Sequence, residues 1–252
     1  MSSLLQDLRG KLDNCDGQLQ KLFQERMEII QKVAAYKKEQ KLPIYDPRRE
    51  AEILSRYTGS EQEFFRTLLR LSRYEQSLVL FPYNIILIGF MGVGKTSVGA
   101  KLAQHLGREF LDLDDLLEKR LEMTISQYFA NQGEGAFRRE EGALIQELRT
   151  RQGVVIATGG GAILNSKNVE TLKQQGRLVL LTATPQTITA RLQGDRTRPV
   201  LGGEVTEEGI ATILSQRKSA YAQAAQYTIS TDQLTIEEVV DAVLTSLAQA
   251  DN

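Results

Sequence analysis

The sequence predicts a two-part protein, with an all-α helical domain over residues 1–78 followed by an α/β domain with a parallel sheet over residues 84–252. Residues 4–78 contain few glycines, and their apolar side chains recur every three or four positions, as in helices. Residues 84–252 instead alternate short apolar runs with helical patterns, which is typical of βαβ units. The change of pattern near residue 80 therefore marks a domain boundary.

The first apolar run of the second domain leads into a glycine-rich segment that opens a helical pattern. This segment has the form of a G-x-x-x-x-G-K-[ST] phosphate loop, with glycines at Gly89, Gly92 and Gly94 followed by Lys95 and Thr96. Glycines let backbone N–H groups turn toward phosphate oxygens, and the following helix N-terminus adds positive potential. A lysine there reaches the β- and γ-phosphates, and a threonine hydroxyl binds Mg²⁺. The segment predicts binding of a nucleoside triphosphate, ATP, together with Mg²⁺.

Composition excludes several other classes of protein. A net charge of −1 and a pI near 6.0 argue against a nucleic-acid or membrane binder that relies on charge. The single cysteine, Cys15, excludes an internal disulfide and fits a reducing compartment. The first residues do not form a signal peptide, and no apolar run approaches membrane-spanning length. We expect a cytoplasmic protein.

An apolar stripe runs along the first predicted helix, from Leu5 to Tyr36, with a spacing suited to helix packing. Arg26 interrupts this stripe. A guanidinium in an apolar seam needs an anionic partner, because an unpaired buried charge is strongly destabilising. That partner is either a glutamate of the protein or the carboxylate of a ligand.

A set of polar residues shares a pattern with one family of helical enzymes. The set comprises Arg9, Arg26, Lys37, Asp46, Arg49, Glu50, Ser72 and Gln76, and it resembles the all-helical chorismate mutases. The spacing from Arg9 through Glu50 fits that family without a gap. The interval from Glu50 to Ser72 is shorter than is usual there, so we expect a truncated second helix, a change that could displace Ser72 and Gln76.

The resemblance implies conversion of chorismate to prephenate, a unimolecular rearrangement without a covalent intermediate. Such an enzyme has only to hold the reactive conformer and stabilise the charge that separates in the transition state. By resemblance, Lys37 and Gln76 contact the ether oxygen, Arg26 and Arg9 bind the carboxylates, Glu50 binds the hydroxyl, and Asp46, Arg49 and Ser72 line the pocket.

Helix geometry, together with this resemblance, also predicts a homodimer. Arg9 and Arg26 are 17 residues apart, which is roughly 25 Å along one straight helix. Both cannot bind one small dianion from the same chain. Arg9 is therefore expected to reach the pocket of a partner subunit, in an intertwined dimer as the family also has.

The second domain carries four further motifs along its chain. They are the acids Asp112-Leu-Asp114, the pair Phe137-Arg138, the turn Thr158-Gly-Gly-Gly161, and a cation- and glycine-rich segment with Arg198-Pro199 that is typical of a mobile lid. Together with the phosphate loop they resemble shikimate kinase, and the resemblance covers essentially all of residues 84–252.

This second resemblance implies a role for each matching residue. Arg138 and Arg217 would bind the shikimate carboxylate, Asp114 would contact the acceptor hydroxyl and accept its proton, and Gly160 and Gly161 would let backbone approach the ring. Asp112 would hold water on Mg²⁺ beside Thr96, Arg198 would join Lys95 at the transferred phosphoryl group, Arg191 would pack on adenine, and Glu141 would orient Arg138. The family commonly has a proline two residues after the arginine at position 217, whereas this chain has Ser219.

Three hypotheses follow for the first domain. It is an active chorismate mutase fused to a shikimate kinase, a non-catalytic sensor that binds chorismate or prephenate, or a purely structural dimerisation module. For the second domain the alternative is another small-molecule kinase with the same loop, such as a gluconate or nucleoside monophosphate kinase.

Overall fold

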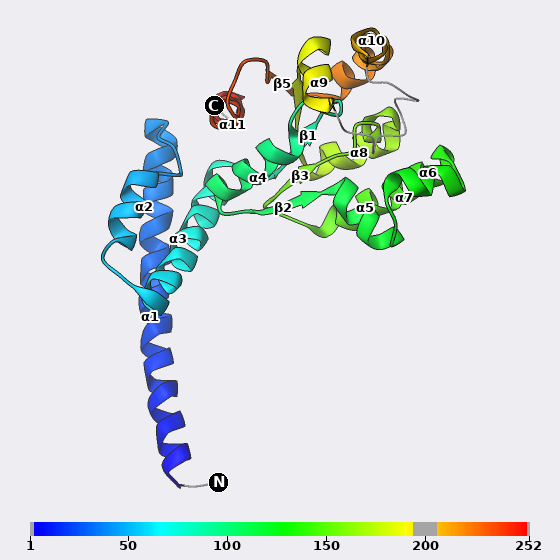
Figure 1. Cartoon of the computed structure of the whole chain (residues 1–252). Helices are drawn as coiled ribbons and strands as arrows, with labels where there is room; N and C mark the ends of the chain where they lie inside the picture. The colour runs from blue at the N-terminus through cyan, green and yellow to red at the C-terminus, as the bar shows by residue number, and fades with distance from the viewer. Residues whose placement is uncertain (1–2, 194–205, 251–252) are drawn as a thin grey trace. The chain divides into compact units, whose positions relative to one another are not determined.

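The computed structural model describes residues 3–193 and 206–250. Contacts divide the chain into two compact units, Met1–Leu80 and Phe81–Asn252 (Figure 1). The predicted lid residue Arg198 and most of the segment around it lie outside the described residues. Within the described ranges, no helix has the combination of length and apolar character that crossing a membrane requires.

The described part of the first unit consists of the helices α1 (Ser3–Gln40), α2 (Pro47–Leu54) and α3 (Gly59–Leu80), which confirms the predicted helical domain. Both α1 and α2 pack against α3. The sequence directs the start of α2, because the Asp46 side chain caps the helix by accepting from the backbone N–H of Arg49, and Pro47 occupies the first helical position.

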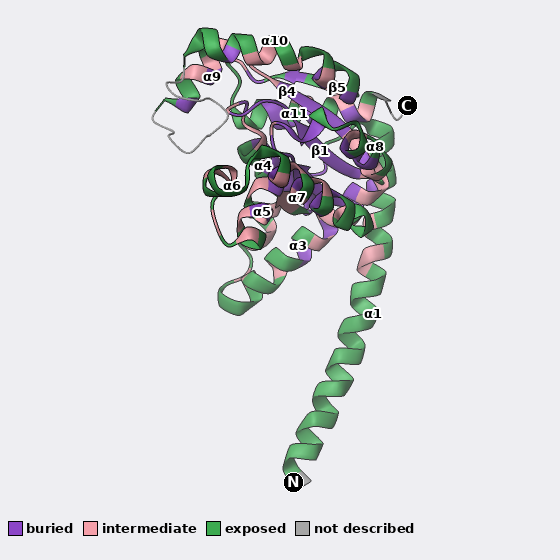
Figure 2. Cartoon of the chain, turned by 90° about the vertical axis from the view of Figure 1, so that its right-hand side faces the viewer, coloured by how far each residue is buried: buried purple, intermediate pink, exposed green. Residues whose placement is uncertain are grey.

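The apolar stripe of α1 is largely exposed in this unit. Figure 2 shows α1 in green along most of its length, and Leu8, Leu12 and Leu19 are 48, 62 and 48 % exposed. Only the C-terminal half of the helix has a buried residue, Ala34. The predicted packing of the stripe is therefore not satisfied within one chain.

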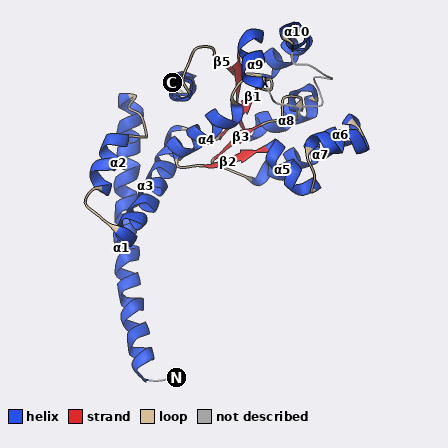
Figure 3. Ribbon diagram, in the orientation of Figure 1, coloured by secondary structure: helices blue, strands red, loops and turns tan. Residues whose placement is uncertain are grey.

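The second unit is built on a parallel sheet whose strands are drawn in red in Figure 3. Its five strands are β1 (Asn84–Ile88), β2 (Glu109–Asp112), β3 (Val154–Ala157), β4 (Gly176–Thr182) and β5 (Tyr227–Ser230). The strand order is β2-β3-β1-β4-β5, and each neighbouring pair is parallel. The parallel sheet of the sequence prediction is confirmed.

Helices cover both faces of this sheet. Besides the 3₁₀ turns η1 (Leu148–Thr150) and η2 (Ala162–Leu164), the helices described are α4 (Lys95–Leu106), α5 (Leu113–Leu121), α6 (Ile125–Gln132), α7 (Glu134–Glu147), α8 (Ser166–Gln175), α9 (Pro185–Leu192), α10 (Glu207–Ala224) and α11 (Ile236–Ala250). One core cluster joins Ile86, Ile156 and Leu178 of the sheet to α5, α7, α8 and α10. Successive strand residues point to opposite faces, and α4 and α11 contact each other and the sheet (Figure 1).

This topology gathers the predicted motifs at one edge. In the sheet, β3 and β2 lie on one side of β1, and β4 and β5 lie on the other. The strand order therefore switches direction at β1. In open parallel sheets the crevice beyond the carboxyl ends of the strands at such a point binds ligands. The phosphate loop, the acids after β2 and the glycine turn after β3 all lie at these carboxyl ends.

Candidate functional site

The phosphate loop connects the buried strand β1 to the first turn of α4. Gly89, Gly92 and Gly94 have φ angles of +143°, +75° and +97°, a region that side chains other than glycine rarely adopt. Gly94 is the N-cap of α4 and supplies no side chain, so the first N–H groups of the helix face the loop. The geometry agrees with the strand–loop–helix predicted from the sequence.

Lys95 and Thr96 begin α4 and extend from it in different directions. The Lys95 ammonium donates to the carbonyl oxygens of Gly89 and Phe90, each at 2.9 Å, so it lies over the loop. The Thr96 hydroxyl donates to Asp112 Oδ2 at 2.7 Å. Two hard oxygen donors therefore meet beside the loop, as the sequence predicted for a magnesium site.

The turn Gly159–Gly161 follows β3 and brings three groups together. A Cβ added to Gly159 would lie 2.8 Å from Asp114 Oδ1 and 2.9 Å from Glu141 Oε1. On Gly160 it would lie 3.4 Å from the backbone N of Met91 in the phosphate loop, and on Gly161 it would overlap the guanidinium of Arg138. The turn therefore lies close to the phosphate loop, to the acids Asp114 and Glu141 and to Arg138.

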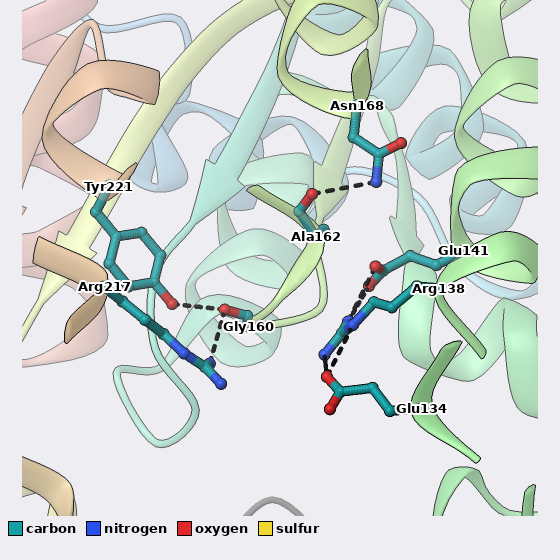
Figure 4. Close-up of polar contacts among 8 residues, drawn as sticks. All are labelled: Glu134, Arg138, Glu141, Gly160, Ala162, Asn168, Arg217 and Tyr221. Carbon is teal, nitrogen blue, oxygen red and sulfur yellow. Dashed lines mark hydrogen bonds and ion pairs between the residues drawn. The ribbon is translucent and has the colours of Figure 1, made fainter. Parts of the chain in front are cut away.

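Arg138 is held by two carboxylates of its own helix (Figure 4). Its Nη1 donates to both oxygens of Glu141 at 2.9 and 3.1 Å, and its Nε and Nη2 donate to Glu134 at 3.2 and 2.9 Å. Burial raises the pKa of Glu141, whose side chain is 1 % exposed, and Arg138 only partly offsets this effect. The pairing fixes the guanidinium of Arg138 against Gly161, as expected for an orienting role of Glu141.

Arg217 and Tyr221 approach the same turn from α10, on the other side of Gly160 from Arg138 (Figure 4). Arg217 Nη1 and the Tyr221 hydroxyl both donate to the carbonyl oxygen of Gly160, at 3.3 and 2.6 Å. The Arg217 guanidinium also lies 5.7 Å from the Phe90 ring centre. Arg217 therefore reaches the site although Ser219 stands where a proline is common.

Arg191 links the phosphate loop to the segment that follows β5. Its guanidinium donates to the carbonyl oxygen of Gly92 at 3.3 Å, and to the hydroxyl and the carbonyl oxygen of Thr231 at 2.9 Å each. Its side chain thus lies beside the loop, where the sequence predicts a contact with adenine. The second predicted phosphoryl contact, Arg198, lies outside the described residues.

The helical unit contains a second cluster of predicted residues. Arg26 Nη1 donates to Ser72 Oγ at 2.5 Å, and burial lowers the pKa of Arg26. Gln76, one turn beyond Ser72 on α3, is buried, and its Oε1 has no hydrogen-bond partner among the described residues. The short second helix therefore leaves Ser72 within hydrogen-bond distance of Arg26.

Lys37, another predicted chorismate-site residue, lies near the C-terminal end of α1. Its ammonium donates to the carbonyl oxygen of Ile44 at 2.8 Å. Burial lowers the pKa of Lys37, while the charges of Asp46 and Glu50 act in the opposite direction. Lys37 thus contacts the connection between α1 and α2, whereas Arg26 and Gln76 both contact Ser72 of α3.

Two predicted residues lie away from this cluster within the chain. Arg49 is exposed and forms an ion pair with Glu52 at 2.7 Å, so the structure does not place it in the pocket. Arg9 lies on the exposed N-terminal half of α1. Since α1 is one continuous helix, Arg9 is separated from Arg26 by roughly 25 Å along its axis.

Comparison with known proteins assigns the second unit. The family model described as shikimate kinase matches residues 91–248. The chain belongs to the shikimate kinase family. A shikimate kinase from Pelotomaculum thermopropionicum is 40 % identical over 161 residues, which are 64 % of this chain and 93 % of that protein. The corresponding protein of Geobacter sulfurreducens is 41 % identical over 162 residues, 64 % of this chain and 89 % of the relative.

Solved structures of shikimate kinases agree with this assignment. The Acinetobacter baumannii enzyme in complex with shikimate superposes with a TM-score of 0.64 at 39 % identity, covering 67 % of this chain and 94 % of that one. The Aquifex aeolicus enzyme gives a TM-score of 0.58 at 31 % identity, with 67 and 98 % covered. The first unit matches the family model described as chorismate mutase type II over residues 8–77. Both sequence resemblances are confirmed, and the chain combines a shikimate kinase domain with a chorismate mutase domain.

Three residues of these domains were missing from the sequence prediction. Glu134 precedes Arg138 by four residues on α7, and Tyr221 follows Arg217 by four on α10, so helical spacing contained a signal for both. Arg73 donates to both carboxylate oxygens of Glu50 and lies 5.1 Å from the ring centre of Tyr45. The 23-residue separation of Arg73 and Glu50 carries no local signal.

Proposed function

We propose that the shikimate kinase domain transfers the γ-phosphoryl group of ATP to the 3-hydroxyl of shikimate. The observation that carries the proposal is the turn Gly159–Gly161, which lies close to Asp114 at Gly159, to the phosphate loop at Gly160 and to Arg138 at Gly161. Shikimate has one carboxylate and three hydroxyls, so its recognition needs a guanidinium at one end and a carboxylate acceptor at the other.

Each residue has a distinct part in this reaction. Arg138 and Arg217 bind the substrate carboxylate, and the paired Glu134 and Glu141 keep Arg138 in place. Asp114 accepts the proton of the attacking hydroxyl. Lys95 exchanges its carbonyl contacts for phosphate oxygens and neutralises charge at the transferred group, aided by Arg198. Arg191 packs on adenine.

A divalent cation, Mg²⁺, fits the oxygen donors of Thr96 and Asp112. No group of three or more metal-ligating side chains occurs among the residues that the structure describes. This suits Mg²⁺, which is commonly bound through one or two protein groups, water and substrate phosphates. When bound, the ion would neutralise charge on the phosphates, and Thr96 would hold it directly while Asp112 would hold it through water.

Replacement of Asp114 by asparagine tests the kinase assignment. We expect kcat with shikimate to fall by about 10²–10⁴-fold, because the amide cannot accept the proton, while ATP binding stays within about twofold of wild type, since Asp114 does not contact the phosphates. Coupled ADP release with shikimate, gluconate and nucleoside monophosphates measures both the loss and the substrate. Asp115→Asn, at an exposed neighbouring position, is the matched control. Turnover of another acceptor in place of shikimate would contradict the proposal.

We further propose that the N-terminal domain rearranges chorismate to prephenate. Arg26 binds one carboxylate, Lys37 and Gln76 donate to the ether oxygen, Ser72 and Asp46 line the pocket, and Glu50 binds the hydroxyl. The buried side chains of Ser72 and Gln76 and the desolvated cations of Arg26 and Lys37 support a pocket for a small dianion. A second candidate is a non-catalytic sensor. It is favoured by the ion pair between Arg73 and Glu50, because this pair engages the carboxylate that would otherwise bind the hydroxyl.

The same proposal includes a homodimer in which Arg9 of one subunit enters the pocket of the other. The exposed apolar residues of α1 and an apolar groove of about 430 Å³ between α1 and α3 support it. The groove is lined by Leu19, Phe23, Phe64, Leu68 and other residues of these two helices. A second copy of α1 would bury both surfaces. We also propose a cytoplasmic location for this enzyme.

Complementation between two inactive variants tests the mutase and the dimer together. Lys37→Ala and Arg9→Ala should each abolish loss of chorismate absorbance measured without ATP. Their co-expressed mixture should recover about a quarter of wild-type activity, because half of the dimers are mixed and each then has one intact pocket of two. Lys11→Ala, on an exposed neighbouring position of α1, serves as the control. An inactive wild type whose kinase kinetics respond to chorismate would support the sensor instead.

A further inference from the structure

Tyr221 is a buried tyrosine whose hydroxyl contacts the glycine turn of the kinase site. Tyr221 is 5 % exposed, and its hydroxyl donates to the Gly160 carbonyl oxygen at 2.6 Å. Arg217 donates to the same oxygen over the longer distance of 3.3 Å. A carbonyl oxygen has two lone pairs, so both donors fit at once. Burial raises the pKa of Tyr221 to about 12, so the hydroxyl keeps its proton at neutral pH.

The Gly160 carbonyl sets the direction of the peptide that joins Gly160 to Gly161. Because a trans peptide is planar, a carbonyl pointing toward α10 directs the Gly161 N–H to the opposite side, away from Tyr221. Figure 4 shows Arg138 on that opposite side. A Cβ added to Gly160 would lie 3.4 Å from the backbone N of Met91, so Gly160 lies close to the phosphate loop. One hydrogen-bonded carbonyl thus orients the turn that lies close to both Arg138 and the phosphate loop.

Arg217 and Tyr221 differ in how their contact would change when a ligand enters. A carboxylate near Arg138 attracts the Arg217 guanidinium away from a neutral carbonyl, because a charge-assisted hydrogen bond is stronger than one to a neutral acceptor. Without Tyr221 this movement would leave a polar atom of the glycine turn unpaired, which costs free energy. With Tyr221 in place the carbonyl keeps a donor throughout.

We propose that Tyr221 is a positioning residue of the acceptor site, which holds the Gly160 carbonyl so that the glycine turn keeps its orientation when Arg217 moves to the substrate carboxylate. This inference rests on the proposed kinase function. It assigns Tyr221 no contact with the substrate itself. Its effect is on the affinity for the acceptor, and the nucleotide side is held separately by Lys95 and Arg191.

Replacement of Tyr221 by phenylalanine tests the inference, with Tyr227→Phe on β5 as the matched control. We expect KM for shikimate to rise about tenfold, the equivalent of one hydrogen bond, while KM for ATP stays within about twofold, since the loop contacts are intact. Amide hydrogen exchange in residues 159–162 should become faster in Tyr221→Phe alone.

The outcomes separate this inference from the kinase proposal. A lower melting temperature with unchanged KM for shikimate would give Tyr221 a structural role only and overturn the inference. An equal rise in both KM values would also overturn it, because the acceptor side would not be affected selectively. If the wild type does not phosphorylate shikimate, the substrate proposal fails. The positioning role is then tested by amide hydrogen exchange alone, and an unchanged exchange rate of residues 159–162 in Tyr221→Phe would reject it.

Discussion

Replacing Arg138 with leucine is expected to destabilise the kinase domain by about 3 kcal/mol at neutral pH, because it leaves the carboxylate of Glu141 buried without its partner. Glu141 is 1 % exposed and receives two hydrogen bonds from Arg138. The same change should lower kcat/KM for shikimate about 100-fold, since a charged hydrogen-bond donor for the carboxylate is lost. Urea unfolding followed by circular dichroism and steady-state kinetics measure the two effects.

The loss of stability in Arg138→Leu should depend on pH. Burial raises the folded-state pKa of Glu141, so its contribution to stability is fully present below the unfolded-state pKa and is lost as pH rises through the folded-state value. Removal of Arg138 takes away a charge that lowers this pKa. The stability difference between variant and wild type should therefore shrink as the pH is lowered from 7 to 5.

Arg139→Leu is the matched control for Arg138→Leu, because it makes the same substitution at the next residue of α7, which is exposed. Its free energy of unfolding should differ from wild type by less than about 0.5 kcal/mol at either pH. Equal effects of the two substitutions, or a loss in Arg138→Leu that does not change with pH, would contradict the role assigned to the Arg138–Glu141 pair.

Replacing Gly89 with alanine should have an equally large effect on the nucleotide side of the site. Gly89 has a φ of +143° at the end of β1, and a Cβ there would overlap the carbonyl oxygen of Leu181 in the neighbouring strand β4. The backbone must move to relieve the overlap, which we expect to cost at least about 3 kcal/mol of stability. Because the phosphate loop moves with it, ATP affinity measured by calorimetry should fall more than tenfold.

Gly10→Ala provides the contrasting glycine substitution. Gly10 lies within α1, and a Cβ there would meet no atom within 4 Å. Alanine is the better helix former, so stability should rise by up to about 1 kcal/mol, with ATP affinity unchanged. A Gly89→Ala protein with wild-type stability and ATP affinity would show that the loop tolerates a side chain at this position.

The sequence predicts best those features that depend on residues close together in the chain. The phosphate loop is one such case, because Gly94, Lys95 and Thr96 and their strand and helix are contiguous. The Asp46-Pro47 start of α2 is another, because a helix cap is formed within a few residues. Helical spacing also placed Ser72 and Gln76 on one face of α3.

Weaker local signals explain what the prediction left out. The strand β5 has only four residues, of which Ile229 alone is buried, so it lacks a clear apolar run. The ion pair of Glu50 and Arg73 joins two helices, and the sequence around either residue does not indicate the other. Arg49 is exposed and pairs with Glu52 one turn away on α2, so its place in the pocket stays a prediction from the resemblance.

The sequence by itself determined the two domain classes and the phosphate loop, because these follow from periodicity and short-range spacing, and the two family resemblances implied the residues at both sites. Only the tertiary structure decided that the turn Gly159–Gly161 meets both the phosphate loop and Arg138, and that Tyr221 holds it from α10. The strand order β2-β3-β1-β4-β5 was likewise a tertiary result. The physical reason is that such contacts depend on which strands pair and which helix faces pack, and these choices minimise the free energy of the whole domain rather than of any one segment.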